Sequence, residues 1–358
     1  MRCVLPDSTP NIRFDHEGVC NYCRNHQKIE YKGEDALIKS LETQKAKGGE
    51  YDCIVPISGG RDSTYVLLKM AKDYFLNVLA VNYENPFTDS LAKENLRNAV
   101  DILGVDIIKI KDKNRIHERV FNNNINVFFQ NPNPSMFPLV CTACRAVVPY
   151  EIYKIAKKKN VSCIINGNNP FEEAPFKLAL LNLISEEDLG RKTFSKSVFR
   201  VLKQSSKNAG YFKPLCIQSM LKDYFFANHF TGKKAMRLFN TANINLFSYV
   251  EWDEEEILSR LQSELKWKSP LRINSTWRFD CKVGFLKDFV YKTSLNMTEK
   301  DDFYSIMIRE NKITRDEAIK RLEWENQIYY DEVLSLLKPL GFEDNDLEDL
   351  KGKLHKLY

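Results

Sequence analysis

The stretch Ser58-Gly59-Gly60-Arg61-Asp62-Ser63-Thr64 directly follows the apolar run Tyr51–Ile57 and opens a segment with helical apolar spacing. Two adjacent glycines let a backbone approach an anion closely, and the start of a helix offers N–H groups without a partner inside the helix. The serine hydroxyls supply further donors, so this loop suits a polyphosphate. The alternative is an ordinary capped turn between a strand and a helix. Neither the Walker pattern nor the Gly-x-Gly-x-x-Gly pattern is present, which disfavours an ordinary kinase or dehydrogenase.

Strand-length runs alternate with helical segments around this loop. The runs expected to form strands are Tyr51–Ile57, Asn77–Tyr83, Asp106–Ile110 and Val161–Asn166. The segments expected to form helices are Thr64–Asp73, Asp89–Leu103 and Asn114–Phe129. Strands that alternate with helices form a parallel sheet with right-handed crossovers and helices on both faces. The sequence therefore predicts a doubly wound α/β domain at residues 49–190.

The rest of the chain divides into two further regions. Residues 1–48 are rich in cysteine and turn residues, and contain one expected helix, Glu34–Lys47, but too few apolar side chains for a core of their own. A bound metal would stabilise such a segment. Residues 191–358 lose the strand pattern and are expected to be mainly helical, forming a domain that binds substrate or a partner. Their expected helices are Glu254–Leu265, Thr298–Glu310 and Thr314–Leu337.

Composition and charge exclude several classes of protein. With 43% hydrophobic and 28% charged residues, the chain is neither disordered nor fibrous. No apolar run reaches the ~20 residues of a membrane span, and the first ten residues lack the apolar core of a leader, so we expect a cytoplasmic location without membrane contact. A net charge of +5 is too small to indicate a nucleic-acid partner.

Two local clusters in the C-terminal half have more than one interpretation. The stretch 191–213 carries seven basic and no acidic residues, so it could receive a sugar-nucleotide diphosphate or tRNA, or form a solvated helix face. Trp277-Arg278-Phe279-Asp280 with Lys282 is a polar and aromatic cluster that could contact substrate.

Nine cysteines without a secretion signal favour metal or redox chemistry over disulfides. Cys20 and Cys23 form a Cys-x-x-Cys pair with Cys3 upstream, and this set is expected to bind zinc. A tetrahedral site needs a fourth ligand, for which His26 or His16 could serve. The alternative is a surface pair without metal.

A second pair, Cys141 and Cys144, precedes an expected helix and follows a proline-rich connection that could project into the crevice of the sheet. The start of a helix lowers the pKa of a thiol. Structural zinc, or a thiol pair without metal, is slightly favoured over an iron–sulfur cluster at this site. The isolated Cys53 and Cys163 lie in apolar runs and are expected to be packing residues.

The run Ser58–Ser63 resembles the Ser-Gly-Gly-x-Asp-Ser signature of the PP-loop ATP pyrophosphatases. The resemblance implies a fold like that of the adenine nucleotide alpha-hydrolases, and cleavage of ATP between the α and β phosphates with adenylation of a carbonyl oxygen. It also implies a catalytic role for Ser58, Asp62 and Ser63, with Mg²⁺ at Asp62. The expected ATP-binding residues are Ser58, Gly59, Gly60, Arg61, Asp62, Ser63, Asn82, Tyr83, Gly167 and Asn168.

More of the chain resembles one branch of that superfamily, the N-acetyl sugar amidotransferases of bacterial surface-glycan pathways. The motifs occur in the family's order: Arg2–Asp7, Ile12–Asp15, Gly18–Cys23, the phosphate loop, Cys141–Cys144 and Gly167–Pro170. The resemblance implies that the acetamido group of an N-acetyl sugar or sugar nucleotide is adenylated and converted to an acetamidino group. Its product would belong to a lipopolysaccharide O-antigen or a related nonulosonate.

Two features of the chain bear on that resemblance. Related chains present a Cys-x-x-Cys before the proline that corresponds to Pro6, whereas this one begins Met1-Arg2-Cys3. No Gly-x-Cys-x-Gly elbow marks a glutaminase, so a separate glutaminase subunit is expected to supply ammonia.

The alternative function is tRNA thiolation. PP-loop enzymes that transfer sulfur hold a [4Fe–4S] cluster with a cysteine pair and one remote cysteine. Cys141 and Cys144 would be that pair here, and Cys216 is the candidate third ligand.

Overall fold

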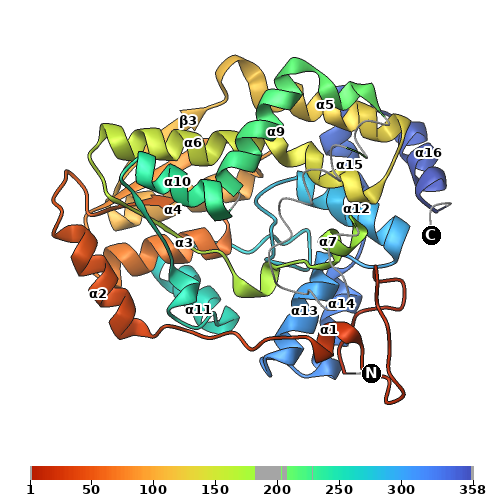
Figure 1. Cartoon of the computed structure of the whole chain (residues 1–358), viewed down its shortest axis with the longest axis horizontal. Helices are drawn as coiled ribbons and strands as arrows, with labels where there is room; N and C mark the ends of the chain where they lie inside the picture. The colour runs from red at the N-terminus through yellow and green to blue at the C-terminus, as the bar shows by residue number, and fades with distance from the viewer. Residues whose placement is uncertain (1, 182–202, 204–207, 228, 356–358) are drawn as a thin grey trace.

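The computed structural model describes residues 2–181, 203, 208–227 and 229–355. Its centre is a five-stranded sheet with the order β3-β2-β1-β4-β5, in which every neighbouring pair is parallel. The strands are β1 Cys53–Pro56, β2 Val78–Glu84, β3 Asp106–Lys111, β4 Cys163–Asn166 and β5 Ala242–Asn245. The predicted α/β fold class, with a parallel sheet, is confirmed (Figure 1).

The strand order places a topological switch point at β1. The chain continues from β1 to β2 and β3 on one side, and then returns to β4 and β5 on the other side. In open α/β sheets, ligands bind outside the carboxyl ends of the strands next to such a point. The loop Ser58–Gly60 follows the carboxyl end of β1, so the topology puts the predicted phosphate loop in this crevice.

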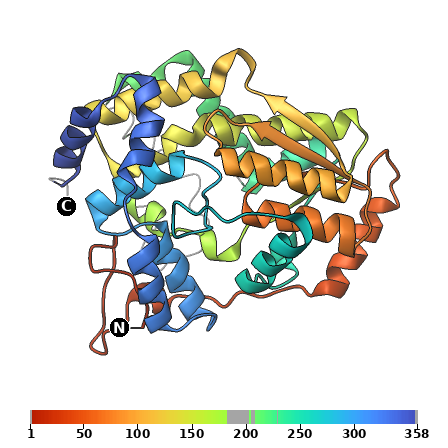
Figure 2. The same cartoon turned by 180° about the vertical axis from the view of Figure 1, so that it is seen from behind.

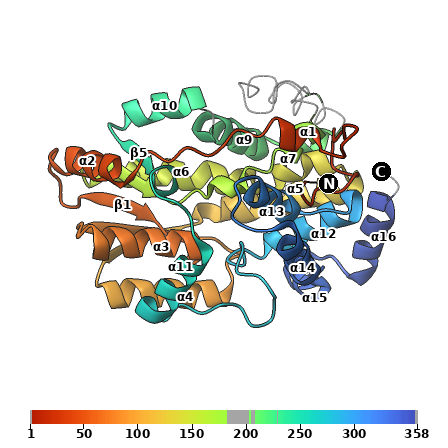
Figure 3. The ribbon, with the colours of Figure 1, turned by 90° about the horizontal axis from the view of Figure 1, so that it is seen from below.

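Alternate residues of β1 pack into two different cores. Cys53 and Val55 belong to a large apolar cluster that includes α3 Arg61–Leu68, α4 Ser90–Leu103 and α11 Glu254–Leu265. Ile54 points to the opposite face and packs with α6 Thr142–Lys158 and α10 His229–Leu238. Figure 2 shows α3, α4 and α11 side by side, and Figure 3 shows the sheet between the two helical layers. Helices therefore cover both faces, as the alternating pattern predicts.

Most predicted elements of residues 49–190, the predicted nucleotide domain, lie within a few residues of the observed ones. The helix predicted at Thr64–Asp73 starts three residues earlier, at Arg61, and its last turn, Lys69–Asp73, is a π-helix. The helix predicted at Asn114–Phe129 is α5 Ile116–Gln130. A further helix of this region is α7 Phe176–Leu180, and α9 Pro214–Ala227 lies beyond the predicted end of the domain.

The fifth strand was not predicted. β5 lies beyond residue 190, in the region expected to be mainly helical, and pairs in register with β4 from Cys163–Ala242 to Asn166–Asn245. The sheet thus extends past the predicted end of the nucleotide domain. The sequence of β5, Ala-Asn-Ile-Asn, is short and half polar, so it has no strand signal apart from its neighbours.

The helix predicted at Thr314–Leu337 is two helices, α14 Arg315–Glu325 and α15 Tyr330–Leu337. The break begins at Asn326, whose side-chain amide donates to Asp301 Oδ2 over 2.7 Å. Asp301 belongs to the capping box of α13 Glu299–Arg309, so the polar side chain at the break stabilises the start of another helix. Thr314 is the N-cap of α14, because its hydroxyl accepts from the Glu317 amide.

The predicted N-terminal region lies against two parts of the molecule. Its first part, with the short helix α1 Asn21–Arg24, packs beside the C-terminal helices, where the Val4 amide donates to Ser305 Oγ over 3.3 Å. Its helix α2 Glu34–Lys45 instead packs on the core of the sheet through Leu37 and Leu41. Figure 3 shows this division. The C-terminal helices are α12 Val283–Leu295, α13, α14, α15 and α16 Asp344–His355.

None of the helices in the described ranges combines the length and apolar character that crossing a membrane requires.

Candidate functional site

The phosphate loop approaches α4 closely. Gly59 has a φ of 87°, and a Cβ at this residue would lie 1.9 Å from the carbonyl oxygen of Ala92. Only glycine fits there, for both conformational and steric reasons. The Ser58 and Ser63 hydroxyls lie 3.1 Å apart, and the Gly60 amide donates to Ser58 Oγ over 3.2 Å. The loop therefore gathers hydroxyl and amide donors at the start of α3, as the motif predicts.

A cavity of about 390 Å³ lies beside this loop. It is lined by Ser58, by the carboxyl end of β2, and by parts of α4 and β3. Asn82 and Tyr83, predicted to contact adenine, both line it, and so do the cations Lys93, Arg97 and Lys109. A cavity of this size can hold a nucleoside. Its wall also carries the carboxylates of Glu84 and Asp101, so the three cations exceed the acidic groups by one.

A buried histidine that the sequence reading did not identify supports the wall of this cavity. His117 Nδ1 lies 3.2 Å from the Tyr83 hydroxyl, and the two rings stack with centroids 5.8 Å apart. Burial lowers the pKa of His117 to about 4, although Asp112 and Glu118 oppose this shift. His117 is therefore neutral at pH 7 and holds the Tyr83 side chain in place.

The charged residues of the loop have partners in the C-terminal half. The Arg61 guanidinium contacts Asp62 and Glu254, donates to Thr276 Oγ1 over 3.0 Å, and lies 4.7 Å from the Trp252 ring. Burial disfavours its charge, but Asp62 and Glu254 outweigh this cost and raise the pKa of Arg61. Arg61 and Asp62 are not among the residues that line the cavity, so Arg61 is placed to fix the loop rather than to contact ATP there.

Two tryptophans from the same half bind the loop directly. Trp252 Nε1 donates to Asp62 Oδ1 over 3.0 Å, and Trp267 Nε1 donates to the Gly59 carbonyl over 3.1 Å. Both indoles are almost fully buried. Sequence reasoning missed them because a lone tryptophan in a helical region is usually a core residue.

The cluster Trp277–Asp280 also reaches this loop. A Cβ on Gly60 would lie 3.2 Å from both Cγ and Oδ2 of Asp280, so the carboxylate sits against the loop backbone. Trp277 Nε1 donates to Glu172, which also pairs with Arg278 over 2.8 Å. The predicted polar and aromatic cluster therefore belongs to the site.

Gly167 and Asn168 follow β4 at the same edge of the sheet. A Cβ on Gly167 would lie 2.6 Å from Val66 Cγ2 and 3.3 Å from the Asp62 carbonyl, so glycine permits close packing on α3. The Asn168 amide donates to Asn245 Oδ1 over 2.8 Å, and this residue joins β4 to β5 instead of lining the cavity.

The N-terminal cysteines form a compact buried group. The sulfurs of Cys3, Cys20 and Cys23 all lie within 4.8 Å of one another, and those of Cys3 and Cys20 are 3.6 Å apart. Thiolates around a tetrahedral zinc are ~3.8 Å apart, given Zn–S bonds of ~2.3 Å. The three residues therefore fit a mononuclear metal site, as predicted, and this is the one such group among the described residues.

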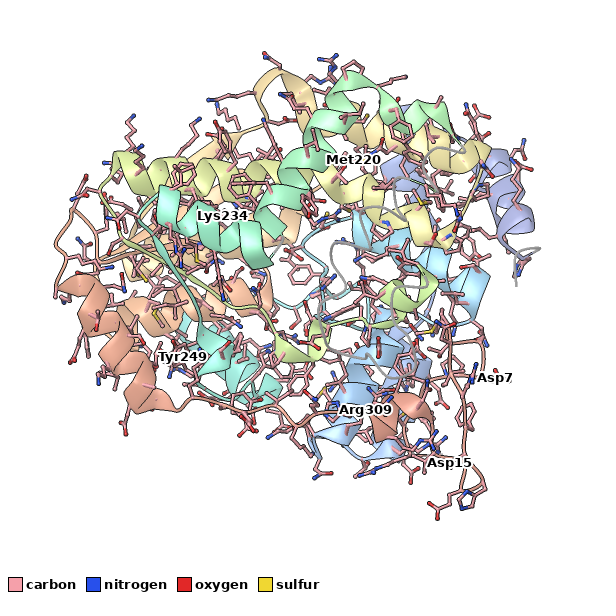
Figure 4. All side chains as sticks on the ribbon, viewed as in Figure 1. Asp7, Asp15, Met220, Lys234, Tyr249 and Arg309 are labelled. Carbon is pink, nitrogen blue, oxygen red and sulfur yellow. The ribbon has the colours of Figure 1, made fainter. Side chains whose placement is uncertain are left out.

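The surroundings of this group favour the thiolate form at Cys3 only. Hydrogen bonds from Cys20 and Cys23 lower the pKa of Cys3, and the Arg309 guanidinium acts in the same direction. Hydrogen bonds to Cys23 and Cys3, together with burial, raise the pKa of Cys20. The hydrogen bond to Cys20 lowers the pKa of Cys23, but the hydrogen bond to Cys3 and burial outweigh it, so this pKa is raised as well. Arg309 donates to Cys23 Sγ over 3.5 Å and to Cys3 Sγ over 3.7 Å. In Figure 4 it lies where α13 meets α1.

The two candidate fourth ligands lie elsewhere, which corrects the prediction. His26 Nε2 contacts Glu310, whose nearly buried carboxylate attracts the imidazole. His16 is on the surface, 3.9 Å from Glu17. Neither histidine belongs to the group formed by the three cysteines.

The second cysteine set also differs from the prediction. Cys216 packs with Val120 and Ala143 and accepts from Asn123 over 3.3 Å, and it forms no metal-binding group with Cys141 and Cys144 in the described part of the chain. Burial raises the pKa of Cys144, and the neighbouring Cys281 raises it further. The expected activation by the helix start is therefore wrong for Cys144, because desolvation outweighs it.

The cysteine near this pair is Cys281, which follows Asp280. Burial raises its pKa to about 12, with Cys141 as the next cause. The Cys141, Cys144 and Cys281 sulfurs are not all within 4.8 Å of one another, which is too far apart for a shared single zinc ion. Most of the basic stretch 191–213 lies outside the described residues.

No family model matches the sequence. Over 182 residues, the chain is 26% identical to an uncharacterized protein of Methanocaldococcus jannaschii, MJ1599. That match spans 49% of this chain and 58% of the relative. Among solved structures, the chain is similar to an NH3-dependent NAD synthetase from Campylobacter jejuni, with 14% identity and a TM-score of 0.30 over 54% of this chain and 94% of the other. It is also similar to an NMN synthetase from Francisella tularensis, with 13% identity and a TM-score of 0.29 over 57% of this chain and 90% of the other.

Proposed function

We propose that this chain is an ATP-dependent enzyme of the PP-loop type, which cleaves ATP to AMP and pyrophosphate. One observation carries the proposal: the loop Ser58–Ser63 lies at the switch point of a parallel sheet and borders a cavity of about 390 Å³ that Asn82 and Tyr83 also line. The signature of the loop supplies the chemistry, and the topology puts it where such sheets bind nucleotides.

The cavity would hold the adenosine, with Asn82 and Tyr83 at its base. The phosphates would extend to Ser58 and the start of α3, where hydroxyl and amide donors converge. Mg²⁺ bound with ATP would neutralise phosphate charge, and Asp62 is the carboxylate of the motif that would contact it.

We further propose that the acceptor is the acetamido group of an N-acetyl sugar or sugar nucleotide. Its carbonyl oxygen would attack the α phosphorus of ATP, and pyrophosphate would leave. Ammonia would then add to the activated carbon, and AMP would depart with the oxygen, which leaves an acetamidino group. The support is the order of motifs from Arg2 to Pro170, in the region where the buried cysteine group and the phosphate loop both lie.

Ammonia would come from a separate glutaminase subunit, since the chain carries no glutaminase elbow. The group Cys3, Cys20 and Cys23 would hold zinc in a structural role, because it lies against α13 and α14 rather than against the phosphate loop.

A second candidate function, tRNA thiolation, is favoured by one observation. Cys281 follows Asp280, whose side chain lies against the phosphate loop. Cys281 also interacts electrostatically with Cys141 and Cys144, so three cysteines lie near the proposed site of adenylation. A [4Fe–4S] cluster at these residues would mark that function.

The test is incubation with ATP, ammonium and a panel of free and nucleotide-linked N-acetyl sugars, with AMP, pyrophosphate and product mass as readouts. The expected product has NH in place of the acetamido oxygen. AMP and pyrophosphate without an amidine would reject the sugar assignment but keep the ATP chemistry, and no AMP with any acceptor would reject both. Thionucleoside analysis of tRNA from a deletion strain tests the second candidate, which an unchanged profile removes.

A glutamine control tests the predicted partner. The purified chain should use ammonium far better than glutamine. Equal use of the two nitrogen sources would contradict the need for a separate glutaminase.

A further inference from the structure

A carboxylate from outside the motif faces the phosphate loop. Asp280 lies 218 residues after Asp62 in the chain (280 − 62), yet its Oδ2 would be 3.2 Å from a Cβ on Gly60. The side chain is therefore close enough to act on a ligand of the loop.

The position of Asp280 is fixed by main-chain contacts at the entrance to α4. The Asp89 amide donates to the Asp280 carbonyl over 3.0 Å, and the Lys282 amide donates to the Phe87 carbonyl over 2.9 Å. Thr88 and Cys281 form an antiparallel bridge between these two bonds. The same helix contacts Gly59 through Ala92, so the loop and Asp280 are held by one element.

The two carboxylates at the loop differ in how their charge is balanced. Asp62 forms an ion pair with Arg61 over 3.0 Å and accepts from Trp252. Asp280 takes part in no ion pair between described residues. The cation that acts on its charge is Arg278, which itself pairs with Glu172 and Glu299. Burial raises the pKa of Asp280, with the Ser58 hydroxyl opposing the shift.

A desolvated carboxylate beside a phosphate-binding loop would repel its ligand. Two like charges a few ångströms apart repel each other more strongly in a partly buried site than in water, because the effective dielectric constant is lower there. A divalent cation between them turns this repulsion into attraction, and Mg²⁺ in nucleotide sites is held by one or two carboxylates together with phosphate oxygens. The residues present fit such an ion.

We propose that Asp280, together with Asp62, holds the Mg²⁺ that accompanies ATP. This inference rests on the proposed function and adds a ligand that the loop signature does not contain. The metal site is then complete only when the segment Trp277–Lys282 is bound to the entrance of α4.

The test compares the full-length wild-type chain with Asp280→Asn, which keeps the shape and removes the charge. Asp349→Asn is the matched control, since Asp349 is exposed on α16. The probes are Mn²⁺, followed by electron paramagnetic resonance, and α,β-methylene-ATP, whose binding is measured by calorimetry with and without metal. Thermal melting of each variant establishes that it is folded.

Asp280→Asn should weaken Mn²⁺ binding in the presence of the analogue by about tenfold or more, the scale of losing a metal-site carboxylate or its support. Without metal, the same variant should bind the analogue at least as tightly as the wild type, because a repulsive charge is gone. A residue with a merely structural role would not give these opposite responses. Asp280→Glu, which keeps the charge, should retain more Mn²⁺ affinity than Asp280→Asn.

Wild-type Mn²⁺ affinity in folded Asp280→Asn would overturn the assignment and leave the proposed ATP chemistry intact. Failure of the wild type to bind the analogue under any condition would instead overturn the proposed function, and the metal site with it.

Discussion

The phosphate loop and the N-terminal cysteine group are both turn-rich motifs, and both contact the C-terminal half, but they are stabilised differently. The loop is part of the continuous core around β1, where Gly59 meets Ala92 and two indoles donate to the loop. The cysteine group joins a segment with little core of its own to α13 and α14, through three sulfurs, Arg309 and Arg315.

Because the two regions are stabilised differently, substitutions in them should affect different properties of the protein. A polar substitution in the loop removes a ligand contact while the surrounding core keeps the fold, so activity should fall with little change in melting. A substitution among the three cysteines removes the connection itself, so metal and stability should fall first. Substitutions in the two regions test whether activity and stability are affected separately, and their expected effects decrease from Gly59→Ala to Trp252→Phe.

Gly59→Ala should have the largest effect and should damage both fold and binding. Its Cβ would overlap the Ala92 carbonyl at 1.9 Å, so α4 has to move, and a loss of about 5 kcal/mol or failure to fold is expected. Gly33→Ala is the matched control, with a φ of 86° and no atom within 4 Å of its Cβ, and should cost only about 1 kcal/mol. Denaturant unfolding of the two variants is the measurement. Equal losses would show that conformation and not the contact with α4 makes glycine necessary.

Cys20→Ser should affect the N-terminal cysteine group and leave the phosphate loop unchanged. Loss of the metal site is expected to lower the free energy of unfolding by about 4 kcal/mol and to reduce bound metal to background. Cys53→Ser, at an equally buried cysteine in β1, should keep the metal. Elemental analysis beside thermal melting measures both quantities. Full metal content and an unchanged melting temperature in Cys20→Ser would remove the proposed structural role.

Acid should weaken the nucleotide region through His117. The folded pKa of about 4 lies below the ordinary 6.5, so the neutral ring is favoured by folding, and this stabilisation is complete above pH 6.5 and lost as pH falls towards 4. The loss amounts to about 3 kcal/mol. His117→Phe should flatten that part of the pH profile, whereas His16→Ala, at an exposed ring, should not. Unfolding measured from pH 4 to 7 decides this, and an unchanged slope in His117→Phe would assign the acid response to other groups.

Asp62→Asn should keep the fold and lose chemistry. The amide preserves the shape but removes a charge from the proposed Mg²⁺ site, so ATP–pyrophosphate exchange should fall by about 10²-fold. Its melting temperature should fall less than that of Cys20→Ser, because Glu254 still pairs with the buried Arg61. Exchange at the wild-type rate would exclude Asp62 from the reaction.

Trp252→Phe should give the smallest change. Phenylalanine keeps an aromatic ring beside Arg61 but removes the donor to Asp62, and one hydrogen bond to a charged group is worth about tenfold in rate. Trp324→Phe, at an exposed indole on α14, is the control. If exchange is unaffected in Trp252→Phe, the indole supports packing alone.

Local patterns predicted most of the nucleotide domain. Strands β1 to β4 lie within two residues of their predicted ends. The buried strands β1, β2 and β4 are apolar runs that can be recognised one segment at a time, and the edge strand β3 is recognisable from its isoleucines. The group Cys3, Cys20 and Cys23 was also predicted, since the Cys-x-x-Cys spacing is itself a property of ligands on one turn.

Predictions that depended on a distant partner were less accurate. His26 has the right chemistry for zinc, but the buried Glu310, 284 residues away, binds its ring. Cys216 is one of several isolated cysteines. It packs against Ala143, and nothing in its spacing indicates that its sulfur forms no metal-binding group with Cys141 and Cys144.

The sequence by itself determined the sheet's class, the phosphate loop and the cysteine group, because each depends on residue types within a few positions of one another. Only the tertiary structure decided that β5 completes the sheet, that Trp252 and Trp267 hold the loop, and that Asp280 faces it. β5 pairs with residues 79 positions earlier in the chain, and the contacts with the loop join residues 190 to 220 positions apart. They form because burying the C-terminal half against α3 and α4 removes apolar surface from water. The free energy of that burial depends on the total apolar area removed from water and not on the residue spacing within one segment, so no local sequence pattern predicts these contacts.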